Sequence, residues 1–183
     1  MNDADLEGYC VRATERGASH ARQILSDSVV TAAWTRFKCQ FGCPGYDSNY
    51  CCPPHTPTAE KTREIIACYR RAILFHFEVS GISKGYACFK DWKKHFKALL
   101  DIEKEMFKDG FYKTLVFLAG PCLLCRRCEK LEGAPCKFPE LARPSMEGCG
   151  IDVYQTARNN GFQIEPLREK GEDQDVFCLM LVD

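Results

Sequence analysis

Three segments of the chain are continuously apolar, without the alternation of polar and apolar residues that marks a half-exposed strand. They cover residues 72–79, 114–119 and 176–182. Short apolar runs of this kind, bounded by polar or turn-forming residues, are typical of strands that are covered on both faces. The pattern therefore predicts three buried strands.

Between these runs, apolar residues recur at helical spacing. A helix is predicted over 89–108, interrupted on its apolar side by Glu103, and another from Thr56-Pro57 to about residue 70. A third is predicted over 151–159, before Gly161. The apolar stripe of the longest helix consists of Phe89, Trp92, Phe96, Leu99 and Met106.

Alternation of strands and helices predicts an α/β fold. We expect a single domain over 1–183, with a mostly parallel or mixed sheet, helices on both faces and two cysteine-rich cluster-binding loops. Residues 1–27 are interpreted as an N-terminal helical extension with a helix near 3–15. A further strand is expected near 28–37. The strand order cannot be read from the sequence.

Charge and apolar runs exclude several classes of partner. The 183 residues hold 25 basic and 25 acidic side chains, so the chain lacks the basic excess of a protein that follows a phosphate backbone. The start is acidic and unlike a signal peptide, and the longest apolar run has seven residues, too few to span a membrane. We expect a cytoplasmic protein with no nucleic-acid or membrane partner.

The 13 cysteines are an unusual number for this length, and eight of them fall in two short segments. In a chain without an export signal, dense cysteines indicate metal binding rather than a disulfide framework. The isolated ones are interpreted as small core residues, although Cys149, just before a predicted helix, could also be a ligand or a reactive thiol. These isolated cysteines are Cys10, Cys68, Cys88, Cys149 and Cys178.

The later segment carries two successive Cys-x2-Cys steps, at Cys122, Cys125 and Cys128. This spacing lets one loop place three thiolates around an iron–sulfur cubane, whereas zinc sites usually take one such pair from each of two knuckles. Cys136 is the predicted fourth ligand, either of this cluster or of a second one. The segment predicts a [4Fe–4S] cluster, with zinc as the alternative.

The earlier segment is rich in turn-forming residues and could also fold around a metal. It predicts a second [4Fe–4S] cluster, again with zinc as the alternative, and His55 is a further candidate ligand. Cys51 and Cys52 are adjacent, and neighbouring side chains of an extended chain point in different directions, so either or both could be ligands. The predicted ligands here are Cys39, Cys43, Cys51 and Cys52.

The order of these motifs resembles a known family. Cys39-x3-Cys43, Cys52-Pro-Pro, the later four cysteines, Arg143-Pro-Ser-Met-Glu147 and Gly150-Ile-Asp-Val153 are similar to the predicted metal-binding proteins of domain of unknown function 2284. The resemblance implies metal binding of the iron–sulfur kind and an anaerobic or archaeal setting. It implies no particular reaction, and Cys51 has no firm match in the family pattern.

Other polar residues have two interpretations each. His76, inside a predicted strand, is either a satisfied core histidine or a ligand. Arg143 and Glu147 either form a structural ion pair or contact a substrate. Four lysines are either the solvated face of a helix or a docking surface for an acidic redox partner. They are Lys90, Lys93, Lys94 and Lys97.

The chain has no Ser-His-Asp order, P-loop or dinucleotide-binding glycine motif. Three functions remain: a one-electron carrier with two clusters and a redox partner protein, an enzyme or maturation factor with an open iron, and a zinc-stapled interaction module. Full cysteine ligation of both clusters favours the carrier. A three-cysteine site that faces a pocket favours the enzyme or maturation factor.

Overall fold

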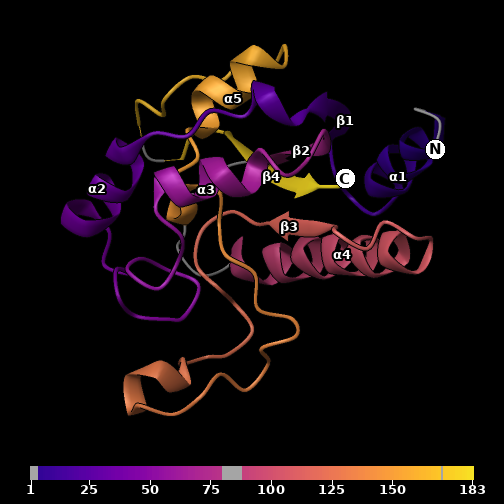
Figure 1. Ribbon diagram of the computed structural model, residues 1–183. Coiled ribbons are helices and arrows are strands. Elements are labelled where there is room, and N and C mark those ends of the chain that lie inside the picture. The colour runs from indigo at the N-terminus through magenta and orange to yellow at the C-terminus, as the bar shows by residue number, and fades with distance from the viewer. Residues whose placement is uncertain (1–3, 80–87, 170) are drawn as a thin grey trace.

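The computed structural model describes residues 4–79, 88–169 and 171–183, apart from the side chains of 4, 5 and 88–91 (Figure 1). Its centre is a four-stranded sheet in the order β1-β2-β4-β3, in which all neighbouring strands are antiparallel. The strands are β1 (His20–Leu25), β2 (Arg71–Val79), β3 (Leu115–Phe117) and β4 (Gln174–Leu181).

The predicted α/β class with helices on both faces is confirmed, but the expected parallel pairing is wrong. β2 and β3 both pair antiparallel with β4, so they run in the same direction, joined by α4 (Cys88–Lys108). β4 occupies the slot between them, which makes a split β-α-β unit. Continuous apolar runs indicate that both faces are covered, and they carry no information about strand direction.

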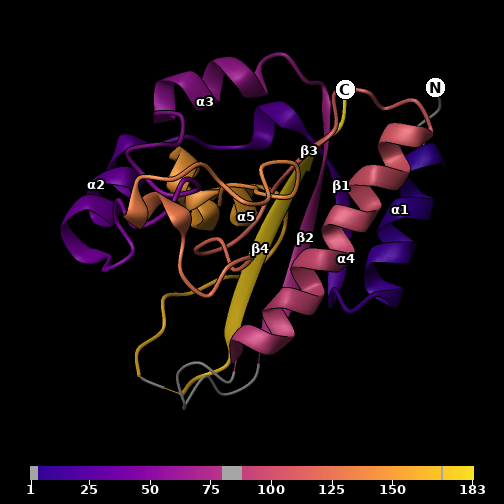
Figure 2. The same cartoon turned by 90° about the horizontal axis from the view of Figure 1, so that it is seen from below.

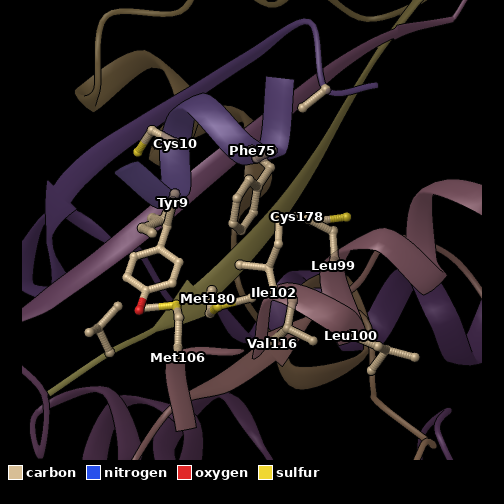
Figure 3. Close-up of a cluster of buried hydrophobic side chains, with 14 of the residues drawn as sticks. Tyr9, Cys10, Phe75, Leu99, Leu100, Ile102, Met106, Val116, Cys178 and Met180 are labelled. Atoms are coloured by element: carbon tan, nitrogen blue, oxygen red, sulfur yellow. The ribbon is translucent and has the colours of Figure 1, made fainter. Parts of the chain in front are cut away.

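One face of the sheet is covered by α1 (Ala4–Glu15) and α4, which lie side by side in Figure 2. Figure 3 shows the core between them and the strands. Phe75 of β2 and Met180 of β4 are fully buried there, with Ile102 and Met106 of α4. The predicted N-terminal helix is therefore confirmed, and it is part of the main core.

Glu103, the interruption in the apolar stripe of α4, is buried against an arginine. The Arg143 Nε lies 3.1 Å from both Glu103 carboxylate oxygens, and its Nη2 lies 2.9 Å from one of them. The predicted ion pair between Arg143 and Glu147 is therefore wrong. The observed pair ties the segment after the later cysteines to α4.

The opposite face is covered by α3 (Ala59–Ile66), α5 (Val153–Asn159) and the 3-10 turn η4 (Glu147–Cys149). α3 and η4 approach closely because Gly150 has no side chain. A Cβ there would lie 2.7 Å from Ala59, and the φ of +82° already favours glycine. This contact fixes η4 beside the helix.

The N-terminal third departs most from expectation. The strand expected near 28–37 is wrong, because this stretch holds a short bridge at Thr31 followed by α2 (Ala33–Gly42). The actual edge strand, β1, lies within the expected helical extension. The apolar residues of α2 resemble a strand in sequence because several of them face solvent: Trp34, Phe37 and Phe41 are exposed.

Candidate metal centre

The two cysteine-rich segments lie together, below α2 and α3 in the view of Figure 1. The Tyr50 hydroxyl donates to the carbonyl oxygen of Ala134 at 2.8 Å. The Lys130 ammonium contacts the Asp47 carboxylate at 2.7 Å. Both contacts join the loop after α2 to the loop after β3, so the candidate ligands form one centre.

Cys51 faces the later segment. Its thiol interacts directly with that of Cys122, and this interaction lowers the pKa of Cys122 and raises that of Cys51. The charge of Cys136 raises the pKa of Cys51 further. Cys51, whose role as a ligand could not be decided from the sequence, therefore lies beside the later cysteines.

Cys52 interacts with cysteines of both segments, and among them most strongly with Cys43. Burial raises the pKa of Cys52, and the charges of Cys43, Cys122 and Cys128 raise it further. Burial likewise raises the pKa of Cys39, with contributions from the charges of Cys43 and Cys52. Cys39, Cys43 and Cys52 thus share one part of the centre.

Cys125 lies among the other later cysteines. Its pKa is raised by partial desolvation and then by the charges of Cys122, Cys128 and Cys136. The structure therefore brings all eight predicted ligands within electrostatic reach of one another in a connected group. His55 is instead held by Asp47, whose carboxylate lies 2.7 Å from its Nε2.

Asn49 is a functional candidate that the sequence analysis missed. Its side-chain oxygen accepts from the backbone N–H of Cys51 at 2.9 Å, and its Nδ2 lies 3.1 Å from the Cys52 sulfur. The Gly45 N–H points at the Cys43 sulfur at 3.4 Å. An asparagine two residues before a turn residue is a recognisable signal, because its side chain often bonds the backbone two positions on.

Arg36 holds α2 in place above the centre. Its Nη1 lies 2.8 Å from the Thr56 hydroxyl oxygen, 2.6 Å from the Pro57 carbonyl oxygen and 2.9 Å from the Gly148 carbonyl oxygen. These contacts connect α2, which carries Cys39, to the segment after Cys52 and to η4. Arg36 therefore fixes the position of Cys39 relative to Cys52.

A cavity of about 670 Å³ opens beside Cys39 and Cys43. The residues that line it include the aromatic residues of α2 and Glu147. Burial raises the pKa of Glu147, and its Oε2 has no hydrogen-bond partner among the described residues.

The isolated cysteines are mostly core residues, as predicted. Cys10 and Cys178 are buried, and burial raises the pKa of Cys149 to about 12, so Cys149 is a core thiol. Cys68 is exposed, which corrects the prediction for that residue. α3 ends at Ile66, so Cys68 lies beyond the helix. The side chain of Cys88 lies outside the described residues.

The remaining polar candidates take structural positions. His76 is buried, and its Nε2 lies 2.7 Å from the Asp175 carboxylate, which occupies one of its two ring nitrogens. The side chains of Lys93, Lys94 and Lys97 are exposed, and Lys97 pairs with Asp101 at 2.7 Å. Lys90 falls outside the described side chains. No helix in the described part of the chain is both long and apolar enough to cross a membrane.

The donor set fits a soft metal or a cluster, because thiolates select iron–sulfur clusters and zinc over hard cations. A family model described as a predicted metal-binding protein, domain of unknown function 2284, matches residues 22–182. The chain belongs to this family. The matched range includes every candidate ligand in both segments. The family description and the close approach of these thiols therefore both indicate metal binding. Neither the curated proteins nor the solved structures give a significant match.

Proposed function

We propose that the protein holds two adjacent [4Fe–4S] clusters and passes single electrons between partner proteins. One observation carries the proposal: Cys51 interacts most strongly with Cys122 and Cys136, whereas the neighbouring Cys52 interacts with Cys43 ahead of Cys122 and Cys128. Two clusters bound on either side of one peptide bond would lie next to each other. Such a pair is suited to moving an electron through the protein.

The contacts support a ligand exchange between the two loops. Cys51 interacts with Cys122, and the charges of Cys122 and Cys128, both in the later segment, act on Cys52. Two-cluster ferredoxins show a comparable exchange, in which one cysteine of a motif serves the other cluster. The proposed sets are Cys39, Cys43, Cys52 and Cys128 for the first cluster, and Cys51, Cys122, Cys125 and Cys136 for the second.

When bound, the clusters would supply reversible one-electron chemistry. The chain's own residues would hold the sulfurs and set their surroundings, with Asn49 Nδ2 and the Gly45 N–H as donors to sulfur. Hydrogen bonds to cluster sulfurs and exposure to solvent are the main controls on the reduction potential. Free thiols in this number suit a reducing compartment, so the proposal includes a cytoplasmic location.

Metal and sulfide analysis of protein purified without oxygen tests the proposal. We expect about eight irons and eight acid-labile sulfides per chain, since each cubane holds four of each. Stoichiometric zinc without sulfide would instead identify a zinc-stapled module. In a zinc site the sulfurs would lie about 3.8 Å apart, given zinc–sulfur bonds of about 2.3 Å.

The cavity beside Cys39 and Cys43 favours a second candidate function. If Cys128 stays with the later cysteines, the first cluster has three thiolates and an open iron next to this cavity. A substrate could then bind to that iron, as it binds at the open position of a catalytic zinc. Cyanide added to the reduced protein separates the two functions. An unchanged electron paramagnetic resonance spectrum indicates a carrier, and a shift of one cluster's signal indicates an open iron.

A further inference from the structure

A second group of metal-ligating side chains lies on the sheet, apart from the cysteines. His20 of β1 and His76 of β2 are direct cross-strand partners. Their rings stack with centroids 5.4 Å apart, and the two Nδ1 atoms lie 3.1 Å apart. Two nitrogens bound to one tetrahedral zinc would lie about 3.3 Å apart, given zinc–nitrogen bonds of about 2.0–2.1 Å. The pair already has close to the spacing of two ligands.

Asp175 of β4 determines which nitrogen of His76 is free. The His76 Nε2 lies 2.7 Å from the Asp175 carboxylate oxygen, which can only accept a hydrogen bond when ionised. The proton of a neutral His76 therefore sits on Nε2, and the lone pair of Nδ1 points toward His20. Carboxylate–histidine–metal arrangements of this kind orient the ring and raise the basicity of the ligating nitrogen.

Glu78 supplies a third donor. It lies two residues after His76, on the same face of β2. One oxygen of Glu78 and one nitrogen from each of His20 and His76 all lie within 4.8 Å of one another. Two imidazoles and one carboxylate form a common donor set for divalent first-row transition metals, and they leave positions open for water or a further ligand.

The surroundings favour a bound ion over a solvated histidine pair. Phe177 stacks on His76 with centroids 4.7 Å apart, and Phe162 packs against the same ring at 5.3 Å. Arg22, two residues after His20 on the same face of β1, is directed elsewhere: its Nη1 donates to the Asn160 carbonyl oxygen, and its guanidinium lies over Phe162. His20 and Glu78 are exposed, so an ion has a path of entry.

We propose that His20, His76 and Glu78 bind a divalent transition-metal ion such as zinc, with Asp175 as a positioning residue. The site is independent of the proposed clusters, since it uses nitrogen and oxygen donors on β1 and β2. Metal binding by these three residues does not depend on whether the cysteines hold iron–sulfur clusters or zinc. The cavity that opens beside Cys39 and Cys43 is also lined by Asp175, whose carboxylate contacts His76.

The proposal is tested by titrating zinc into protein purified without oxygen, with the metal or clusters bound by its cysteines left in place. X-ray absorption spectroscopy at the zinc edge, on protein titrated with zinc, should show nitrogen and oxygen neighbours at about 2.0–2.1 Å. Any sulfur neighbours would lie at about 2.3 Å and are distinguished by that distance. His20→Ala should remove one zinc per chain and this nitrogen signal. Glu78→Gln should weaken binding at least tenfold, and Asp175→Asn by about 10–100-fold.

His55→Ala is the matched control, because His55 is a partly exposed histidine bound to Asp47 and away from β1. It should leave this zinc in place. Equal zinc stoichiometry and affinity in the wild type, His20→Ala and Glu78→Gln would overturn the proposal. So would a zinc spectrum that contains only sulfur neighbours. Both variants alter exposed side chains, so at least one is expected to fold, which circular dichroism checks.

Discussion

The thiols of Cys51 and Cys122 interact directly, and this contact joins the two cysteine-rich segments. It separates Cys51 from its neighbour Cys52, which lies with Cys43 and Cys39. Each segment therefore contributes to the surroundings of the other. A substitution in one segment should therefore affect both proposed clusters, and the proposed exchange of ligands predicts which cluster each cysteine variant loses.

Cys51→Ser and Cys125→Ser should remove the same cluster. Each single variant should lose about half of the iron, and the double variant should lose no more than either one, because residues of one site are not additive. Cys52→Ser combined with Cys125→Ser should lose nearly all of the iron. Iron and sulfide analysis measures these amounts.

Cys68→Ser is the control for that series, because Cys68 is exposed and its sulfur contacts only the Glu64 carbonyl oxygen among the partners described. It should retain full iron content. If Cys51→Ser and Cys125→Ser together lost all of the iron, Cys51 would belong to the first cluster and the exchange would be wrong.

Asn49→Ala should lower the reduction potential of the cluster that holds Cys52. The variant removes the donor 3.1 Å from the Cys52 sulfur, and such donors stabilise the more negative, reduced cluster. Potentiometric titration followed by electron paramagnetic resonance measures the shift. Asn159→Ala, at an exposed position of α5, should leave both potentials unchanged. An unaltered potential in Asn49→Ala would show that this contact does not act on a cluster sulfur.

Arg36→Lys should destabilise the protein by about 1–3 kcal/mol and reduce iron at the first cluster. A lysine ammonium cannot reproduce the guanidinium contacts to Thr56, Pro57 and Gly148, so partly buried oxygens lose their donor. Chemical denaturation and iron analysis measure the two effects. Arg63→Lys is the matched control, since the Arg63 Nε makes a single exposed contact with Thr31 at 3.1 Å.

Asp183→Asn should weaken the fold at neutral pH but not in acid. The buried guanidinium of Arg71 donates to the Asp183 carboxylate and lowers its pKa, so this stabilisation is present above the ordinary aspartate pKa of about 3.9 and is lost as pH falls through the lowered value. We expect a difference of about 1–3 kcal/mol at pH 7 that shrinks below about pH 4. A pH-independent difference would contradict this, and Asp27→Asn is the exposed control.

The sequence predicted much of the fold from its apolar periodicity. The strands at 72–79 and 176–182 and the helix at 89–108 lie within two residues of β2, β4 and α4. These elements are long and bury a continuous surface, so their pattern is strong. β1 was not predicted, because burial alternates only weakly along it. α2 was not predicted as a helix, because its exposed aromatic residues give it the sequence pattern of a strand.

The candidate site was predictable in composition but not in arrangement. Cysteine spacing identifies which residues can be ligands, because a metal needs several thiolates within reach. It does not determine that Cys51 meets Cys122, since that contact depends on how two distant loops pack. The His20, His76 and Glu78 group was equally hidden, because cross-strand neighbours are set by the register of β1 on β2.

The position of β4 between β2 and β3 has a consequence for the order of assembly. β4 follows every candidate cysteine ligand in the chain, and the sheet cannot close around its central slot until β4 has been synthesised. Synthesis proceeds from the N-terminus, and distant strand pairings form late. Both cysteine loops therefore leave the ribosome before the sheet that supports them is complete, so their thiols are synthesised before the fold around them can close.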